Sequence, residues 1–475
     1  MSIRFIHAAD LHIDSPMKGL GEKDSNIAKK VRTATRDAFA RLVQFAIDEK
    51  VSFIVIAGDI FDGEWDDVET GIWAGRQFKL LMDAAIPVYI VYGNHDGKNQ
   101  ILRNMKENVF PSNVHLFSSK EPERFFFIDR ISGERVAITG QGYSAWNCPE
   151  NLAANYPAPE PGVYNVAALH TGLGGERAGS YAPTTVGELR SLGYNYWALG
   201  HQHRREVLCD EPDCWIGYSG VVQTRHVNES VNQDGTTSKG FFLVEVADGR
   251  RIGEPQFVSV DSLRWFRIDV DLSEIDESEP EEAEAAMVEL FLDELRQALS
   301  EAGGALVAAR VRFFGRSCLY GRLTGLYDSD AENPTRLRLY QSLSSLGGEV
   351  WLESLDVSGV KPLIPDDFWN RGVLRSIHDE VMAQNEQLDS LKDNIDGKKQ
   401  GVRAGKAPLK ALDPLVKKLA LFKTDLLCGR RPDPSVQPEK DADGIALDDP
   451  EQYKKWNLEA LDTLADVLKS VEEDV

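Results

Sequence analysis

The chain is organised around residues 88–96, which read Val88-Tyr89-Ile90-Val91-Tyr92-Gly93-Asn94-His95-Asp96. The apolar run at 88–92 predicts a buried strand, and the turn after it carries an amide, an imidazole and a carboxylate. A packed core buries such groups only at a cost, whereas loops on a rigid sheet commonly carry binding and catalytic side chains. The turn at 93–96 is therefore predicted to belong to a functional site.

Four other apolar runs end in the same way, at residues 3–8, 53–57, 166–169 and 196–199. Each run is followed within a few residues by imidazole or carboxylate groups. These are Asp10 and His12, Asp59 and Asp62, His170, and His201 with His203. Carboxylate, imidazole and amide groups on several loops over one sheet are typical of a metal site.

Hydrolysis of a phosphoester by two metal ions requires this set of groups. Two divalent ions about 3.5–4 Å apart share a bridging carboxylate and keep a position open for the water that becomes the attacking hydroxide. A histidine that is not a ligand can protonate the leaving oxygen. Because no thiolate accompanies these motifs, Mn2+ is the preferred ion, with iron or zinc as alternatives. Each motif alone is most often a turn, but five in order predict a metal centre.

The composition is that of a globular protein with two or three domains, since the chain has 475 residues. No apolar run approaches the roughly 18 residues of a membrane span, and no signal peptide is expected because strand-like sequence begins by Ile3. Five cysteines without Cys-x-x-Cys spacing indicate reduced thiols in a cytoplasmic protein. The net charge of −23 argues against a protein that wraps nucleic acid with its own basic surface.

The periodicity predicts an α+β architecture of layered sheets with outer helices. Helices are expected at residues 25–50, 68–85 and 186–192, and short strands from Trp215 to Val246. A boundary near residue 260 is followed by a small α+β domain at 261–362. Its expected elements are strands at 265–270, 305–314 and 349–357 and helices at 281–301 and 334–346. Residues 363–475 predict a helical region, either a hairpin that packs on itself or a docking site for a partner.

Together with the stretch Trp197-Ala198-Leu199-Gly200-His201-Gln202-His203, the five motifs resemble the calcineurin-like metallophosphoesterases. Within that family, residues 9–16, 170–171, 181–183 and 220–226 resemble the SbcD-type DNA repair exonuclease subunits. The resemblance implies a four-layer metallophosphoesterase fold at 1–260, with two packed sheets flanked by helices. It further implies a capping, DNA-binding domain at 261–362 and a helical C-terminal region at 363–475.

The resemblance also implies a role for each motif residue. One metal would be held by Asp10, His12, Asp59 and His203, and the other by Asp59, Asn94, His170 and His201. His95 would act as general acid or would stabilise the transition state, and Asp96 would orient it. Asp62 stands where some branches of the family have a histidine, and no catalytic role is expected of it. Arg225 and His226 would contact the DNA backbone, with a helix cap or a surface pair as the alternative.

The function implied by the resemblance is an Mn2+-dependent phosphodiesterase that acts on DNA ends as an exonuclease and also as an endonuclease. It would be a homodimer joined through helices of the catalytic domain, with an SMC-like coiled-coil ATPase as partner. The ATPase would supply the basic surface that this chain lacks. Two alternatives stay open. One is a metallophosphoesterase of small nucleotide-type phosphoesters, and the other is a non-catalytic adaptor with structural metals.

Overall fold

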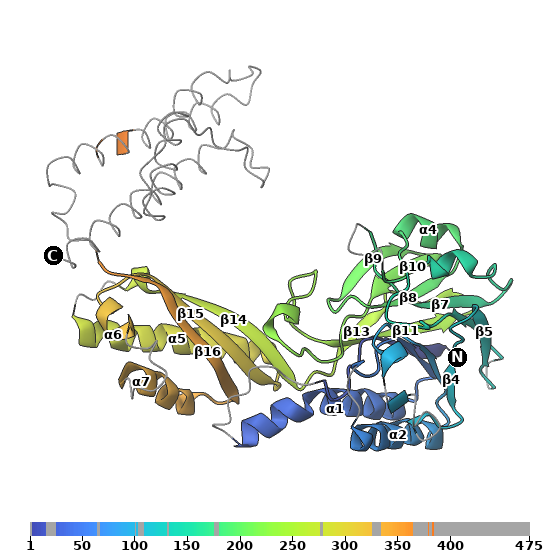
Figure 1. The fold of residues 1–475 in the computed structure, drawn as a ribbon, viewed down its shortest axis with the longest axis horizontal. Coiled ribbons are helices and arrows are strands. Elements are labelled where there is room, and N and C mark those ends of the chain that lie inside the picture. Colours follow the sequence, from blue (N-terminus) through green and yellow to red (C-terminus); the bar gives the residue numbers. More distant parts are fainter. Residues whose placement is uncertain are drawn as a thin grey trace. The chain divides into compact units, whose positions relative to one another are not determined.

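The structure is a computed structural model that describes residues 2–15, 25–63, 67–99, 101–102, 109–130, 133–174, 180–275, 279–324, 334–363, 379 and 382–383 (Figure 1). The chain divides into two compact units. One comprises Met1–Asp271, Glu284–Phe314 and Gly325–Gly359, and the other Leu272–Ala283, Gly315–Thr324 and Val360–Val475. The helices predicted beyond residue 363 lie outside the described residues, apart from three isolated positions. Across the residues that are described, none of the helices is long and apolar enough to span a bilayer.

The first sheet of the larger unit has seven strands. Its order is β12-β11-β1-β2-β3-β4, and β13 pairs with β11. Strands β1 to β4 are parallel, and β11 closes the sheet antiparallel to β1. The strands are β1 (Ile3–Ala8), β2 (Phe53–Ala57), β3 (Val88–Val91), β4 (Val114–Leu116), β11 (Gly240–Ala247), β12 (Arg250–Arg251) and β13 (Gln256–Ser259).

The second sheet has six strands in the order β5-β6-β7-β8-β10-β9. Strands β6, β7, β8 and β10 are parallel, whereas β5 and β9 are antiparallel edge strands. The strands are β5 (Glu123–Ile128), β6 (Arg135–Gly140), β7 (Tyr164–His170), β8 (Tyr196–Gly200), β9 (Glu206–Glu211) and β10 (Cys214–Tyr218).

A buried apolar core joins the two sheets face to face. The rings of Phe5 in β1 and Tyr196 in β8 meet edge to face with centroids 5.4 Å apart, and Phe53 in β2 meets Phe127 in β5 at 5.1 Å. On the outer face of the first sheet lie α1 (Ser25–Asp48) and α2 (Val68–Asp83), which run side by side (Figure 1). Helix α4 (Val186–Ser191) and the 3-10 turn η2 (Leu152–Asn155) cover the second sheet. The predicted four-layer fold is confirmed.

After this double-sheet body the chain forms a third, three-stranded sheet in the order β14-β15-β16. Strands β14 and β15 are parallel, with Leu263 opposite Leu306. The elements are β14 (Leu263–Asp271), α5 (Pro280–Ala302), β15 (Leu306–Arg316), α6 (Tyr320–Thr324), α7 (Pro334–Ser342) and β16 (Val350–Lys361). Besides η2, the described residues form four short 3-10 turns, namely η1 (Asp96–Lys98), η4 (Val227–Glu229), η5 (Leu272–Glu274) and η7 (Leu343–Ser345). The predicted strands and helices agree with these elements to within a few residues.

Candidate metal centre

The metal centre is the group of side chains that the predicted motifs place at the ends of five strands. Strands β1, β2 and β3 are neighbours in the first sheet, and β7 and β8 are neighbours in the second. The loops that follow them meet because the two sheets approach closely here. A Cβ atom added to Gly200 would lie 1.8 Å from the carbonyl oxygen of Ala57, so only glycine fits at this contact. The ligands predicted are Asp10, His12, Asp59, Asn94, His170, His201 and His203.

The backbone at several of these positions has an unusual conformation. Asp10, His12, Asp59 and His201 have φ angles of 50°, 41°, 53° and 100°. Residues other than glycine seldom adopt positive φ, and such strain concentrates at functional sites. Backbone hydrogen bonds hold Asp10 and His12 in this conformation. The N–H of Asp10 donates to the carbonyl of Gly58, and that of His12 donates to the carbonyl of Asp59. The first two motif loops are therefore joined by their backbones.

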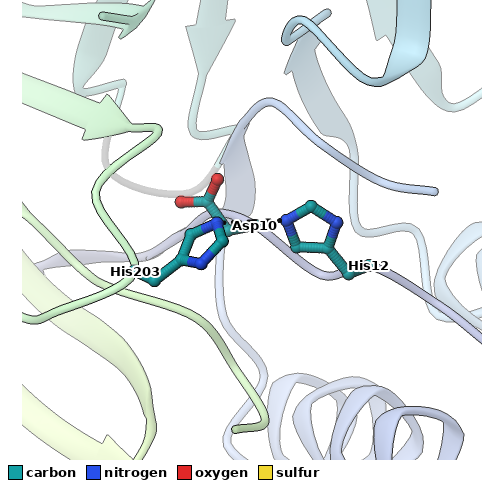
Figure 2. Close-up of side chains that lie close together, drawn as sticks. All are labelled: Asp10, His12 and His203. Atoms are coloured by element: carbon teal, nitrogen blue, oxygen red, sulfur yellow. Dashed lines mark hydrogen bonds between the residues drawn. The ribbon is translucent and has the colours of Figure 1, made fainter. Parts of the chain in front are cut away.

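The first donor group comprises Asp10, His12 and His203, whose ligand atoms all lie within 4.8 Å of one another (Figure 2). The Nδ1 atom of His12 is 2.7 Å from the Asp62 carboxylate, and the Nδ1 atom of His203 is 2.7 Å from the Glu229 carboxylate. Because an ionised carboxylate only accepts, both Nδ1 atoms carry the hydrogen. The Nε2 lone pairs of His12 and His203 therefore face each other, 3.3 Å apart. A bound cation satisfies both.

The second donor group comprises Asp10, Asp59 and His170. His170 donates from Nδ1 to the carbonyl oxygen of Ala57 at 2.9 Å, which leaves the Nε2 lone pair pointing away from that carbonyl. This Nε2 atom lies 3.5 Å from Oδ2 of Asp59 and 3.0 Å from Oδ1 of Asn94. The same Oδ2 of Asp59 is 3.8 Å from Nε2 of His12. Asp59 of the second group therefore also faces His12 of the first group, and Asp10 belongs to both groups.

His201 joins this centre through its backbone and its ring. Its N–H donates to both carboxylate oxygens of Asp10, at 3.2 and 3.1 Å. Its ring centroid is 5.2 Å from that of His170 and 4.4 Å from that of Tyr181. The structure therefore brings all seven predicted ligands together.

Burial determines the protonation of the imidazoles. It lowers the pKa of His12 to about 3 and that of His201 to about 4, and it lowers the pKa of His170 well below its usual value. These rings are therefore neutral near pH 7, which is the form that binds a metal.

Burial has the opposite effect on the carboxyl groups. It raises the pKa of Asp10 to about 6. The pKa of Asp59 is raised by burial and by the carboxylates of Asp96 and Asp10. A divalent cation reverses this effect, because it stabilises the ionised form. The oxygen and imidazole donors gathered here fit divalent metal ions.

His95 lies at the outer side of the centre. Its side chain is 26% exposed, compared with 1% for His12. The Nδ1 atom accepts the N–H of Gly63 at 3.2 Å, so the hydrogen is on Nε2. The ring rests against Trp146, with centroids 4.6 Å apart, and its backbone N–H donates to Asp59 at 2.9 Å. This imidazole is thus placed to donate a hydrogen bond to a bound substrate.

Asp96 differs from its predicted role of orienting His95. Its carboxylate accepts the backbone N–H groups of Ile60 at 2.9 Å, Phe61 at 3.3 Å and Gly93 at 3.0 Å. The carboxylate beside the His95 ring is that of Asp62, 3.4 Å from Nδ1. Asp96 therefore holds the loop that follows Asp59, and its charge raises the pKa of the Asp59 carboxyl.

The side chains of Arg225 and His226, which were predicted to contact DNA, bind groups of the protein itself. The Nδ1 atom of His226 accepts the N–H of Asn228, so this residue forms the helix cap that was its alternative. Arg225 is half-buried and pairs with Asp62 and Glu229. Sequence reasoning missed Glu229, because a single glutamate in a short polar turn gives no pattern to recognise.

The family follows from comparison with known proteins. Residues 3–205 match the model of the calcineurin-like phosphoesterases, and residues 265–359 match the model of the middle domain of the metallophosphoesterase YhaO. Residues 3–205 therefore form a calcineurin-like phosphoesterase domain, and the fold and the clustered side chains of this part of the chain agree with that class.

Similar individual proteins include a metallophosphoesterase, a DNA repair protein and a nuclease subunit. The uncharacterized metallophosphoesterase YhaO of Bacillus subtilis is 35% identical over 57% of this chain and 64% of its own length. The DNA double-strand break repair protein Mre11 of Methanopyrus kandleri is 28% identical over 56% and 58%. A component of the nuclease SbcCD of Staphylococcus epidermidis is 23% identical over 56% and 72%. The matched part of the chain thus spans less than two thirds of the length of the YhaO and Mre11 relatives.

Proposed function

We propose that this protein is a two-metal-dependent phosphodiesterase that cleaves DNA as an exonuclease and an endonuclease. The observation that carries the proposal is the position of Asp59 between two donor groups. It lies 3.5 Å from His170 and 3.8 Å from His12. Relatives named as DNA repair proteins and nucleases support the choice of DNA over a small phosphoester. We further propose a cytoplasmic location, since DNA is the substrate.

The first ion would be held by Asp10, His12, Asp59 and His203, and the second by Asp59, Asn94, His170 and His201. Two Mn2+ ions bound there would activate water and neutralise the phosphoryl oxygens. The chain itself supplies the geometry. Asp62, Glu229 and the carbonyl of Ala57 keep three imidazoles oriented with Nε2 toward the ions. The Nε2–H of His95 would donate a hydrogen bond to the phosphoryl group or the leaving oxygen and so stabilise the charge that develops in the transition state.

The proposal extends to the role of the middle domain, to an ATPase partner and to a second copy of this chain. Residues 265–359 match a middle domain that a phosphatase of small molecules does not need, and they are proposed to bind DNA. Because the chain carries a net charge of −23, an SMC-like coiled-coil ATPase is proposed to supply further DNA-binding surface. A homodimer is proposed through α2, where apolar side chains are exposed.

The test incubates the purified chain with Mn2+ and end-labelled duplex DNA, in parallel with bis(p-nitrophenyl) phosphate. We expect cleavage of both substrates and loss of both activities with a chelator. Release of labelled nucleotides would identify exonuclease activity, and cleavage of circular single-stranded DNA would identify endonuclease activity. Turnover of a nucleotide monoester with intact DNA would favour a small-molecule phosphatase. Bound Mn2+ without any turnover would favour the adaptor.

A further inference from the structure

The guanidinium of Arg225 lies inside the metal centre, where its side chain is only 14% exposed. Its Nη1 atom is 3.2 Å from Oδ1 of Asp62 and 3.3 Å from Oγ of Ser15. Its Nη2 atom is 2.9 Å from Oε1 of Glu229. Ser15 follows β1, Asp62 follows β2 and Glu229 follows β10, so one guanidinium joins three loops. A residue with this many internal partners is poorly placed to bind a DNA backbone.

The two acidic partners of Arg225 are the groups that orient metal ligands. Asp62 accepts from Nδ1 of His12, and Glu229 accepts from Nδ1 of His203, each at 2.7 Å. Arg225 contacts the same two carboxylates, with Nη1 at Asp62 and Nη2 at Glu229. It therefore stands between two carboxylates, each of which fixes one imidazole.

We infer that Arg225 is a positioning residue of the metal centre, which holds Asp62 and Glu229 so that His12 and His203 direct Nε2 at the same ion. The inference rests on the metal-dependent part of the proposed function and replaces the predicted DNA contact. A planar guanidinium binds two groups in fixed directions, which the ammonium of lysine cannot do. Groups behind metal ligands typically contribute about 10–100-fold to metal affinity or activity.

The test uses Arg225→Lys, which keeps the charge and removes the fork, and Glu229→Gln, which removes the negative charge behind His203 and leaves a neutral amide. We expect each to weaken Mn2+ binding by roughly 10–100-fold in calorimetric titration. The Mn2+ concentration for half-maximal turnover of bis(p-nitrophenyl) phosphate should shift by the same factor. Affinity for duplex DNA in the presence of a chelator, measured by fluorescence anisotropy, should match wild type.

The matched control is Arg190→Lys, because Arg190 pairs with the exposed Glu211 at 2.7 Å and lies outside the metal centre. It should bind Mn2+ like wild type. If circular dichroism shows that one variant does not fold, the Mn2+ affinity of the other variant tests the inference. Unchanged Mn2+ affinity in the folded variants would overturn the inference, as would weaker DNA binding with normal Mn2+ affinity. Wild-type protein that binds Mn2+ without cleaving DNA would refute the DNA substrate alone.

Discussion

Hydrogen positions on single imidazoles decide what the metal centre can bind. His12 and His203 donate from Nδ1 to carboxylates, and His170 donates from Nδ1 to the carbonyl of Ala57. All three therefore present Nε2 as an acceptor. His95 has the opposite arrangement, because its Nδ1 accepts from Gly63. The three proposed ligand rings thus offer an Nε2 without hydrogen, whereas His95 offers an Nε2–H, although all four rings lie within one site.

The role of His95 is tested by His95→Ala. Loss of this hydrogen-bond donor should reduce turnover of a chromogenic diester by about 10²–10³-fold, because removal of one preorganised donor to the transition state typically costs that much. Metal content, measured by inductively coupled plasma mass spectrometry, should stay at the wild-type level, since His95 is outside the proposed ligand set. Undiminished turnover would refute the assignment, and loss of metal would make His95 a ligand.

His7 makes a pH-dependent contribution to stability. It donates from Nε2 to the carbonyl of Leu199 and accepts from the hydroxyl of Tyr196, and burial lowers its pKa to about 3. The unfolded chain therefore binds more protons than the folded chain between pH 6.5 and 3. The stabilisation is fully present above pH 6.5 and is lost as the pH falls, by about 1.4 kcal/mol per unit.

His7→Gln tests this contribution, because an amide can donate to Leu199 without titrating. Melting temperatures of wild type and variant are compared between pH 7.5 and 5. We expect the wild type to lose more stability on acidification, although the variant is less stable at pH 7.5. Parallel pH dependences of the two proteins would show that His7 does not titrate in this way.

At the scale of the elements, the approach of β8 to β2 positions the motif loops. Gly200→Ala would place a methyl group 1.8 Å from the carbonyl oxygen of Ala57. Backbone atoms cannot yield cheaply, so we expect a loss of about 3 kcal/mol or more in unfolding free energy, together with weaker Mn2+ binding. Urea denaturation and Mn2+ titration measure the two effects.

A glycine in open space provides the comparison. Nothing lies within 4 Å of a Cβ added to Gly187 in α4. Gly187→Ala should therefore leave Mn2+ binding unchanged and stabilise the protein by about 0.5–1 kcal/mol. Equal effects of the two substitutions would contradict the close approach of β8 to β2.

Local pattern is enough to predict most strands and helices of the described residues, and to mark the side chains that the structure gathers in one region. Apolar runs followed by Asp59 or His170 are visible in any short window of the sequence, and periodicity marked α1 and α2. Three features depend on residues that are distant in the chain. They can be seen only in the folded chain. They are the pairing of β1 with β11, the contact of Glu229 with His203, and the backbone contacts of Asp96. No local propensity specifies them.

At the scale of the whole molecule, α2 carries exposed apolar side chains that suit self-association. Val68, Ile72 and Leu80 are 54%, 42% and 46% exposed, and the first two are one helical turn apart. If α2 forms the dimer interface, Ile72→Glu should yield a monomer in size-exclusion chromatography with light scattering. Leu337→Glu, at an exposed position of α7, should leave the dimer intact. A monomeric wild type, or a dimeric Ile72→Glu, would exclude this interface.

The antiparallel pairing of Ile3 with Val246 has a consequence for biosynthesis. During translation the opening strand leaves the ribosome long before its second neighbour has been made. Until then it presents an unsatisfied edge that invites pairing with other nascent chains. Late closure of a nonlocal sheet is also slow. We therefore expect this edge to stay open to mispairing until the strand at residues 240–247 has been made.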